Sequence, residues 1–298
     1  MRALVTGGAG FLGSHIVDAL RARGDDVVVL DDLSTGARAN LDPAVRLVVT
    51  DISDRDAVRD RVSGERFDAV VHAAAKTKVV ESISQPALYH SVIVDGTSNA
   101  LDVAQLSGAS AFVNISTGGA LYGETPACAT EDTPIDAPSP YGRYKAEAER
   151  LVASTPGLRS VTLRLANIYG PRQRTDLEGG VIAIFAGCWK RQVPITVYGD
   201  GTAERDYLYV ADAVGAVLAA LGHPTGGTYN IGTGVATSVN DLLERMAALL
   251  GPPAGVVRAA AREGEIQRSC LDAGKAAHDG LWHPSVPLAD GLQRTVAA

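Results

Sequence analysis

Cysteine is scarce in this sequence, whose 298 residues include only Cys128, Cys188 and Cys270. An odd number of widely spaced cysteines argues against a disulfide framework, so we expect a reducing compartment and cysteines that pack as small hydrophobic residues. An excess of positive charge is also missing, because 27 Lys and Arg stand against 34 Asp and Glu and no basic run is visible. The net charge of −7 therefore disfavours a nucleic-acid surface, and we expect no nucleic-acid partner.

Long apolar runs are absent as well, since no stretch reaches membrane-spanning length. An apolar strand begins at Arg2, which leaves no room for a signal peptide. We therefore predict a cytoplasmic enzyme or binding protein with no membrane partner. The chain has 46% hydrophobic and 20% charged residues, the ordinary balance of a globular protein with one large domain or two closely joined ones.

The first residues predict a phosphate-binding turn. An apolar run, Arg2 to Thr6, is followed directly by GGAGFLG at residues 7–13 and then by an amphipathic stretch to Arg23. In a strand, glycine turn and helix of this kind, Gly7 permits the tight turn, Gly10 lets the backbone approach a pyrophosphate, and Gly13 allows close packing of helix on strand. The free N–H groups at the start of the helix then supply hydrogen bonds to the anion.

The next strand, Val27 to Leu30, indicates which dinucleotide binds. It ends in Asp31, about twenty residues after the glycine turn. A carboxylate at this place accepts hydrogen bonds from an adenosine ribose and repels a 2′-phosphate, so NAD is favoured over NADP. Arg38, further along the same loop, works against that preference.

Further strands at 46–49, 69–72 and 111–115 alternate with helices at about 57–62 and 86–106, which predicts an α/β fold with a doubly wound parallel (Rossmann) sheet. The last of these strands delivers Ser116 and Thr117 to its carboxyl end, where open α/β sheets bind ligands. His72 ends another strand, and we expect a packed histidine beside the cofactor channel. No second histidine stands at ligand spacing, so we predict no metal.

Tyr141 and Lys145 are four residues apart, which places both on one face of a helix. There the ammonium of Lys145 can stabilise the phenolate of Tyr141 and lower the pKa of the phenol. A tyrosine of this kind can act as a general acid or base. The pair alone is more typical of a solvated helix face with a half-buried tyrosine, so the acid/base interpretation depends on the neighbouring motifs.

Taken together, the ordered motifs resemble the extended short-chain dehydrogenase/reductases, and within them the NAD-dependent nucleotide-sugar epimerases of the UDP-glucose 4-epimerase type. The resemblance spans essentially the whole chain. Its motifs are TGGAGFLG at 6–13, Asp31, Asp51-Ile52, HAAA at 72–75, Ser116-Thr117 before Tyr122-Gly123, Tyr141-x-x-x-Lys145, LRLANIYGPR at 163–172, VYGDG at 197–201, RDY at 205–207, YNIGTG at 229–234 and REGE at 262–265.

This resemblance implies that Tyr141 is the acid/base, that Lys145 supports it and contacts the nicotinamide ribose, and that Thr117, with Ser116 as neighbour, supplies the hydroxyl partner. The cofactor residues implied are Gly7, Gly10, Phe11, Leu12, Gly13, Asp31, Asp51, Ile52, Ala73, Ala74, Ala75 and Lys145. The substrate residues implied are Thr117, Tyr141, Asn167, Val181, Tyr198, Arg205, Arg262 and Ser269. Asn167 and the two arginines suit a nucleotide diphosphate, because guanidinium groups bind phosphate in bidentate fashion.

The implied architecture has an NAD-binding part, residues 1–166 with about 206–229, and a smaller α/β nucleotide-sugar-binding part, residues 167–205 and 230–298. A helix from Ser238 to Leu250, stopped by Gly251, belongs to the smaller part. Relatives dimerise through the long helix after Pro86 and the Tyr141 helix, so a homodimer is expected by analogy.

Departures from the family pattern bear on the reaction. The sugar 4,6-dehydratases carry an Asp-Glu pair after the strand-end threonine, whereas Gly118-Gly119 here cannot transfer a proton, although Glu124 or Asp132 could reach in from the loop. Ile93 stands where relatives usually have asparagine. Ser269 stands where some hexose-specific relatives have a tyrosine. Either this small residue leaves room for an N-acetyl group, or it is only a packing residue.

The implied function is inversion at C4 of a UDP-hexose through a transient 4-keto sugar. UDP-glucose and UDP-galactose are the expected substrates, and UDP-GlcNAc and UDP-GalNAc are expected to be accepted as well. The alternatives are another short-chain enzyme on a nucleotide sugar, such as a dehydratase or reductase, and a non-catalytic NAD sensor.

Overall fold

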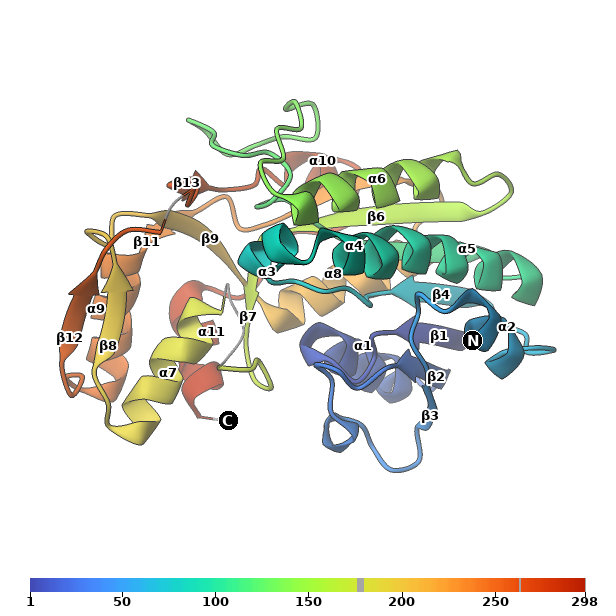
Figure 1. Cartoon of the computed structure of the whole chain (residues 1–298), viewed down its shortest axis with the longest axis horizontal. Helices are drawn as coiled ribbons and strands as arrows, with labels where there is room; N and C mark the ends of the chain where they lie inside the picture. The colour runs from blue at the N-terminus through green and yellow to red at the C-terminus, as the bar shows by residue number, and fades with distance from the viewer. Residues whose placement is uncertain (176–179, 263, 298) are drawn as a thin grey trace.

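The computed structural model describes residues 1–175, 180–262 and 264–297, and its larger part is built on one seven-stranded sheet (Figure 1). All of its strands are parallel, in the order β10-β6-β5-β4-β1-β2-β3. The strands are β1 (Arg2–Thr6), β2 (Asp26–Asp31), β3 (Arg46–Val49), β4 (Ala69–His72), β5 (Ala111–Thr117), β6 (Arg159–Leu165) and β10 (Gly227–Ile231). The order reverses beside β1, as in a doubly wound sheet, so the predicted fold class is confirmed.

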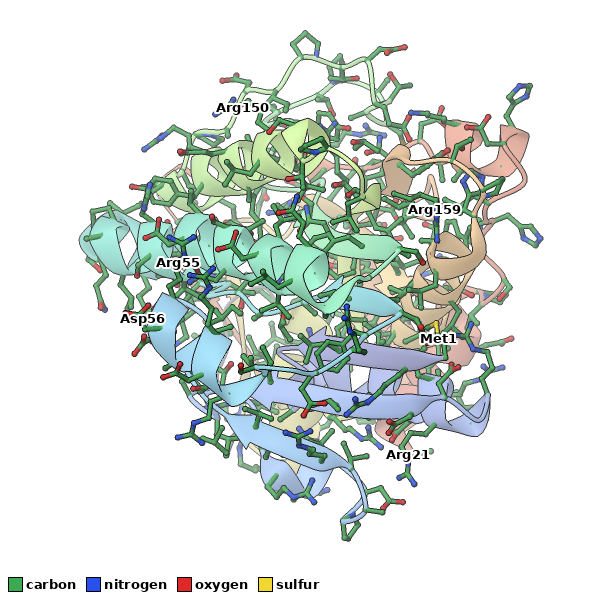
Figure 2. All side chains as sticks on the ribbon, turned by 90° about the vertical axis from the view of Figure 1, so that its right-hand side faces the viewer. Met1, Arg21, Arg55, Asp56, Arg150 and Arg159 are labelled. Carbon is green, nitrogen blue, oxygen red and sulfur yellow. A yellow bond between two sulfur atoms is a disulfide. The ribbon has the colours of Figure 1, made fainter. Side chains whose placement is uncertain are left out.

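Helices cover both faces of this sheet. Successive residues of a strand point to opposite faces, so Leu4 and Val5 belong to two separate hydrophobic clusters. The cluster of Val5 packs under α1 (Phe11–Ala22) and α8 (Val210–Gly222), and that of Leu4 under helices on the other face. Those helices are α2 (Arg55–Arg61), α5 (Gly96–Ser107) and α6 (Pro140–Ser154). Charged side chains such as Arg55 and Arg150 project from these outer helices into solvent (Figure 2).

The helix expected from residue 86 to 106 is interrupted. After α3 (Val79–Ser84), the chain forms α4 (Pro86–His90), one π-helical turn (Ser91–Asp95) and then α5. The Thr97 hydroxyl donates to the Ile93 carbonyl at 2.6 Å and also contacts His72, so the wide turn is tied to the end of β4. Such π turns are often found at functional sites, and sequence periodicity does not reveal them.

The smaller part has a four-stranded and a two-stranded sheet. The first contains β7 (Asn167–Tyr169), β9 (Glu204–Tyr209), β11 (Ala236–Ser238) and β13 (Arg268–Ser269), and the second contains β8 (Ile195–Tyr198) and β12 (Val256–Ala259). The remaining helices are η1 (Arg38–Asn40) in the larger part, and α7 (Val181–Arg191), α9 (Val239–Leu250), α10 (Gly274–His278) and α11 (Leu288–Val296). Because β9 pairs within the smaller sheet, the chain returns to the larger one at α8, slightly later than expected. The division into two functional parts stays a prediction.

The helix α9 shows how local sequence sets these boundaries. The Ser238 hydroxyl accepts a hydrogen bond from the Asp241 N–H at 3.0 Å, which caps the helix start. Gly251 ends the helix with a φ of 81°, a conformation that glycine adopts readily. The predicted helix is therefore confirmed with both of its end residues. Over the described residues, none of the helices combines the length and apolar character needed to cross a bilayer.

The cysteines correct a prediction. Cys128 and Cys270 form a disulfide, so the expectation of three unpaired, simply packed cysteines is wrong, and the cysteine argument for a reducing compartment falls with it. The two are 142 residues apart, and only the fold brings them together, through a bridge between Ala129 and Leu271. Cys188 is the free cysteine, half-buried on α7. A cytoplasmic location stays a prediction.

Candidate active site

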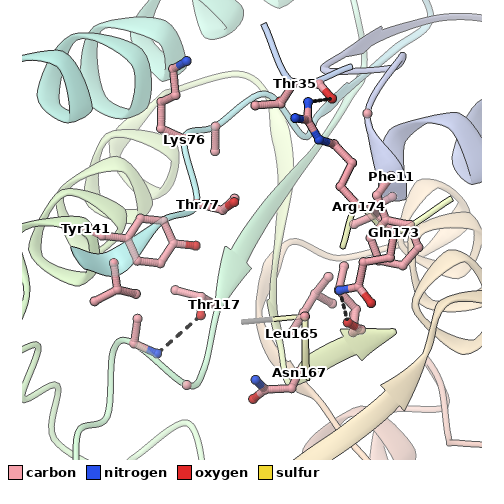
Figure 3. Close-up of a pocket in the computed structure, with 18 of the residues that line it drawn as sticks. Phe11, Thr35, Lys76, Thr77, Thr117, Tyr141, Leu165, Asn167, Gln173 and Arg174 are labelled. Carbon is pink, nitrogen blue, oxygen red and sulfur yellow. Dashed lines mark hydrogen bonds between the residues drawn. The ribbon is translucent and has the colours of Figure 1, made fainter. Parts of the chain in front are cut away.

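A cleft of about 990 Å³ opens at the carboxyl ends of the large sheet, and its wall reaches into the smaller part (Figure 3). Every site residue predicted from the sequence lies on its wall. They are Gly7, Gly10, Phe11, Leu12, Gly13, Asp31, Asp51, Ile52, Ala73, Ala74, Ala75, Ser116, Thr117, Tyr141, Lys145, Asn167, Val181, Tyr198, Arg205, Arg262 and Ser269. The structure thus brings into one cavity residues spread over 263 positions, Gly7 to Ser269.

The glycine turn at one end of the cleft fits a dinucleotide phosphate. Gly7 has a φ of 68°, and a Cβ on it would lie 2.6 Å from the Ala74 nitrogen. A Cβ on Gly13 would lie 2.1 Å from the Gly7 carbonyl oxygen, so only glycine permits this packing. Gly10 at the start of α1 makes no side-chain cap, which leaves the first N–H groups of the helix to face an anion.

Asp31 lies beside this turn, at the end of β2. Its buried carboxylate accepts hydrogen bonds from the N–H groups of Ala9, at 2.9 Å, and Leu33, at 2.8 Å. Burial raises the pKa of Asp31, and these hydrogen bonds oppose the rise. Arg38, which could have favoured a 2′-phosphate, donates instead to the carbonyl oxygen of Pro43 at 2.8 Å and is not on the cleft wall. The local geometry therefore fits NAD.

Tyr141 lies in the first turn of α6, which Ser139 caps by accepting from the Gly142 N–H at 3.1 Å. Burial raises the pKa of Tyr141 to about 12, and the neighbouring Thr117 side chain opposes the rise. Lys145 donates to the carbonyl oxygen of Ile115 at 3.0 Å, and burial lowers the pKa of Lys145 to about 8. The expected lowering of the Tyr141 pKa by Lys145 is thus wrong for the protein alone, because loss of hydration outweighs other influences on the phenol.

The structure distinguishes the two candidate hydroxyl groups. Ser116 is buried, and its hydroxyl donates to Glu149 at 2.5 Å, away from the tyrosine. Thr117, the next residue, turns to the opposite side of the strand and meets Tyr141 (Figure 3). Ile93 packs against Tyr141 in a small apolar cluster, so the residue that replaces the family's asparagine supports the tyrosine by packing.

His72 is a packed histidine. It is 1% exposed and its two ring nitrogens contact the hydroxyl groups of Thr6, at 2.7 Å, and Thr97, at 3.0 Å. Burial lowers the pKa of His72 to about 3, with a smaller contribution from Lys145. Within the described ranges, we find no cluster of three or more side chains able to hold a metal ion.

The substrate side of the cleft is formed where the smaller sheet meets β5. Ser269 pairs with Arg205 in the register of β13 and β9. A Cβ on Gly119 would lie 3.2 Å from the Ser269 hydroxyl and 3.7 Å from the Asn167 amide oxygen, so these three residues surround one small space. Arg262 lies over the ring of Tyr198, with its Cζ 4.1 Å from the ring centroid. Glu263, beside it in the motif, lies outside the described residues.

The carboxylates that could have replaced the dehydratase acid and base do not reach the cleft. Glu124 accepts hydrogen bonds from the N–H groups of Gln267, at 2.6 Å, and Arg268, at 2.8 Å, and neither Glu124 nor the exposed Asp132 lines the cavity. At Gly118 a side chain would collide with Leu271, since a Cβ would lie 2.4 Å from its Cδ2. No carboxylate adjoins Thr117 in this loop.

Sequence reasoning missed several residues of the cleft. Arg174 reaches from the smaller part to the carbonyl oxygen of Thr35 at 3.3 Å (Figure 3). Lys76 contacts the Ser34 hydroxyl at 3.3 Å. Lys76 directly follows the motif at 72–75 and Arg174 lies two residues after the motif at 163–172, which was the signal available. It also missed a buried network behind α6, in which Arg164 binds both Glu149, at 2.6 Å, and the hydroxyl of Tyr122, at 2.6 Å.

A dinucleotide turn on a doubly wound sheet, with a buried tyrosine and lysine and a half-buried threonine in the same cleft, defines an enzyme of the extended short-chain dehydrogenase/reductase class. The chain belongs to the NAD dependent epimerase/dehydratase family, whose pattern matches residues 3–232. The resemblance noted in the sequence is therefore confirmed, and the cofactor of the family is NAD, as predicted.

Among similar proteins is a putative UDP-glucose 4-epimerase from Methanocaldococcus jannaschii, 39% identical over 98% of this chain and 96% of its own. A crystal structure of the Thermus thermophilus UDP-glucose 4-epimerase with NAD has a TM-score of 0.95 and 39% identity, covering 100% of this chain and 98% of that one. The Thermotoga maritima UDP-glucose 4-epimerase, solved with UDP-glucose, has a TM-score of 0.95 and 38% identity, with the same coverage.

Proposed function

We propose that this protein is an NAD-dependent epimerase that inverts C4 of a UDP-hexose, with UDP-glucose and UDP-galactose as its substrates. The observation that carries the proposal is the contact of the Tyr141 phenol with Thr117, in a cleft whose neighbouring loop offers glycines in place of an acid and a base. The family name covers both epimerases and dehydratases. The residues beside Thr117 favour the epimerase, and so do the similar proteins named above.

In the proposed reaction, Tyr141 takes the proton from the sugar 4-hydroxyl while Thr117 holds the same oxygen by a hydrogen bond. The glycine turn, Asp31 and Ala73–Ala75 would hold NAD, which would supply a reversible hydride acceptor for C4. The 4-keto sugar turns over in the cleft, so that a returning hydride would reach the other face of C4, and Tyr141 gives the proton back to the 4-oxygen. The positive charge of the oxidised cofactor would favour the phenolate, which the protein alone disfavours.

The diphosphate of the substrate fits the far wall of the cleft. Arg205 and Arg262 supply guanidinium groups and Asn167 supplies an uncharged amide. Arg205 forms an ion pair with Glu265 at 3.3 Å. A bound phosphate would take the place of Glu265 as the partner of the Arg205 guanidinium. These contacts anchor the nucleotide while the sugar remains able to rotate.

A substrate panel tests the proposal. The purified protein is incubated with UDP-, dTDP- and GDP-sugars without added reductant, and the products are identified by NMR. We expect interconversion of C4 epimers of UDP-glucose and UDP-galactose. An unsaturated or deoxy product would indicate a dehydratase, and no turnover on any sugar would leave an NAD sensor as the better interpretation.

Homodimerisation through the helices after Pro86 and through α6 is part of this proposal, supported by analogy with the family. Light scattering on the purified protein distinguishes a dimer from a monomer of 30.9 kDa.

A further inference from the structure

Three successive turns of α6 hold three successive residues of β5. The Tyr141 phenol faces the side chain of Thr117, Lys145 donates to the carbonyl oxygen of Ile115, and Glu149 accepts from the hydroxyl of Ser116. The first two helix residues belong to the proposed reaction. Glu149 completes the series one turn deeper, and no step of the proposed reaction uses it.

Glu149 is a buried carboxylate whose hydrogen bonds are well satisfied. Its side chain is 8% exposed, and Arg164 binds it through Nε, at 3.1 Å to both oxygens, and through Nη2, at 2.6 Å. The Tyr122 hydroxyl in turn accepts from Arg164 at 2.6 Å and donates to Asn230 at 2.8 Å. A buried ion pair of this kind gives little net stability over a hydrophobic pair, so its position calls for a different explanation.

That position is beside Lys145. The two residues are four apart on one helix and therefore share a face. The other titratable groups that face Lys145 are Tyr141 on α6 and His72 on β4, with Arg164 on β6 behind the glutamate. His72 and Tyr141 are neutral near pH 7, since their pKa values are about 3 and about 12. Glu149 is the carboxylate that opposes the effect of burial on Lys145.

We propose that Glu149 is a positioning residue, whose carboxylate, oriented by Arg164, holds Ser116 so that Thr117 meets Tyr141, and supplies the counter-charge of Lys145. The inference rests on the proposed function for the roles of Tyr141, Thr117 and Lys145, and its test does not depend on turnover. Without Glu149 the strand end would lose one of its three ties to α6. Lys145 and Arg164 would then be two buried cations without the Glu149 carboxylate as their counter-charge.

The test measures the protonation of Lys145 directly. The NAD-loaded protein is labelled with ¹³C at Cε of its five lysines, and the signal of Lys145 is assigned by its loss in Lys145→Arg. Its titration midpoint is then compared between the wild type and Glu149→Gln, which keeps the size of the side chain. The variant loses one negative charge that lies one helix turn from Lys145 and stabilises its ammonium. With an effective dielectric near 20, we expect the titration midpoint of Lys145 to be lower by about one to two pH units in the variant.

Two variants serve as controls. Glu147→Gln makes the same change two residues earlier on α6, at a half-buried position on a different face, and Ser116→Ala removes only the hydroxyl contact. Both should leave the Lys145 midpoint within a few tenths of a unit. Ser116→Ala should also lower kcat, by about tenfold, with little change in KM. An unchanged midpoint in Glu149→Gln overturns the proposal, whereas a wild type without turnover on UDP-sugars counts only against the proposed function.

If circular dichroism shows that Glu149→Gln does not fold, the double variant Glu149→Gln/Arg164→Met replaces it. Removing both members of a buried ion pair is better tolerated than removing one. Glu149 is the charged group that raises the pKa of Lys145, so the midpoint should still fall, by about half a unit or more. A midpoint equal to that of the wild type, or higher, overturns the proposal in this background too.

Discussion

Lys145 donates a hydrogen bond to the carbonyl oxygen of Ile115, at 3.0 Å, and so connects the middle of α6 to the end of β5. The ammonium thereby holds the strand residues that precede Thr117. The same backbone contact sets the position of the ammonium relative to the Tyr141 phenol. The cation and the phenol are held by different partners on the same strand. The proposed acid/base group is therefore oriented by the sheet, and its charge state can respond to the cofactor.

Replacing Tyr141 by phenylalanine tests the acid/base role. The change removes the hydroxyl that faces Thr117 and leaves the buried ring. We expect kcat for UDP-galactose to fall by about 10²- to 10⁴-fold, because proton transfer loses its positioned group, while the protein still binds NAD. Tyr144→Phe, on the same helix, is the matched control and should keep near wild-type turnover. A Tyr141→Phe protein with more than a tenth of the wild-type kcat would contradict the assignment.

The hydroxyl of Thr117 should matter in its own right. Thr117→Ala removes the group that is expected to hold the reacting sugar oxygen, and the loss of one such donor typically lowers kcat by about 10²-fold or more. Thr117→Ser keeps the hydroxyl and should recover most of the rate. Steady-state kinetics of the two variants at saturating UDP-glucose decide the matter, since equal rates would show that the hydroxyl has no role.

The sequence was most informative where the determinants are local. Strands 2–6, 46–49 and 69–72 have the predicted bounds, because runs of apolar residues between turns define buried parallel strands. The glycine turn is likewise encoded by adjacent residues, of which Gly7 and Gly13 show why nothing larger fits.

What the sequence could not show depends on contacts between distant residues. The pairing of Cys128 with Cys270, the bonding of Glu149 to Arg164 and the effect of burial on the Tyr141 pKa all arise only when separate segments meet. The two candidate hydroxyl groups were indistinguishable for the same reason. Which of Ser116 and Thr117 faces the tyrosine depends on how β5 lies against α6.

His72 should make the protein sensitive to acid. Its folded-state pKa of about 3 lies below the ordinary value of 6.5, so between these values the unfolded chain binds a proton that the folded protein does not. Stability should therefore decrease as pH falls below 6.5, by about 1.4 kcal/mol per pH unit from this residue. Urea unfolding at pH 7, 6 and 5 measures the slope. His72→Gln should flatten it and His278→Gln, an exposed control, should not.

Ser269 is expected to set the size of sugar that the cleft accepts. The space around Gly119, Asn167 and Ser269 is bordered by small groups, so the wild type should interconvert UDP-GlcNAc and UDP-GalNAc as well as UDP-glucose and UDP-galactose. Ser269→Tyr should lower kcat/KM on the acetylated sugars by about 10²-fold or more, through overpacking, and leave UDP-glucose within tenfold. Ser269→Ala is the control that keeps the space. Equal losses on both sugar classes in Ser269→Tyr would point to general damage of the site.

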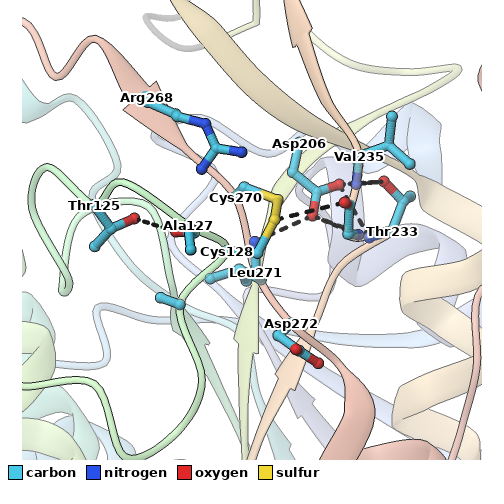
Figure 4. Close-up of a disulfide and its surroundings, with 12 residues drawn as sticks. Thr125, Ala127, Cys128, Asp206, Thr233, Val235, Arg268, Cys270, Leu271 and Asp272 are labelled. Carbon is cyan, nitrogen blue, oxygen red and sulfur yellow. Dashed lines mark hydrogen bonds between the residues drawn. A yellow bond between two sulfur atoms is a disulfide. The ribbon is translucent and has the colours of Figure 1, made fainter.

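The disulfide should stabilise the fold and hold the substrate side of the cleft. Cys128 is in the loop that follows Thr117, and Cys270 follows Ser269 directly, so the bond joins this loop to the end of β13 (Figure 4). Cross-linking residues 142 apart restricts the unfolded chain strongly, and Cys128→Ser/Cys270→Ser should lower the free energy of unfolding by about 2–4 kcal/mol. Denaturant unfolding of this variant should match that of the wild type treated with dithiothreitol.

Cys188→Ser, at the free cysteine, controls for the chemistry of the substitution and should change neither stability nor its response to dithiothreitol. With the bond removed, Ala129 and Leu271 still pair through two backbone hydrogen bonds, of which Asp272 N–H to the Ala129 carbonyl measures 2.8 Å. The loop that contains Cys128 should therefore become more mobile but stay in place. We expect KM for the nucleotide sugar to rise and kcat to stay within a few-fold of the wild type. A double variant with unchanged stability and KM would show that the backbone pairing alone holds this wall of the cleft.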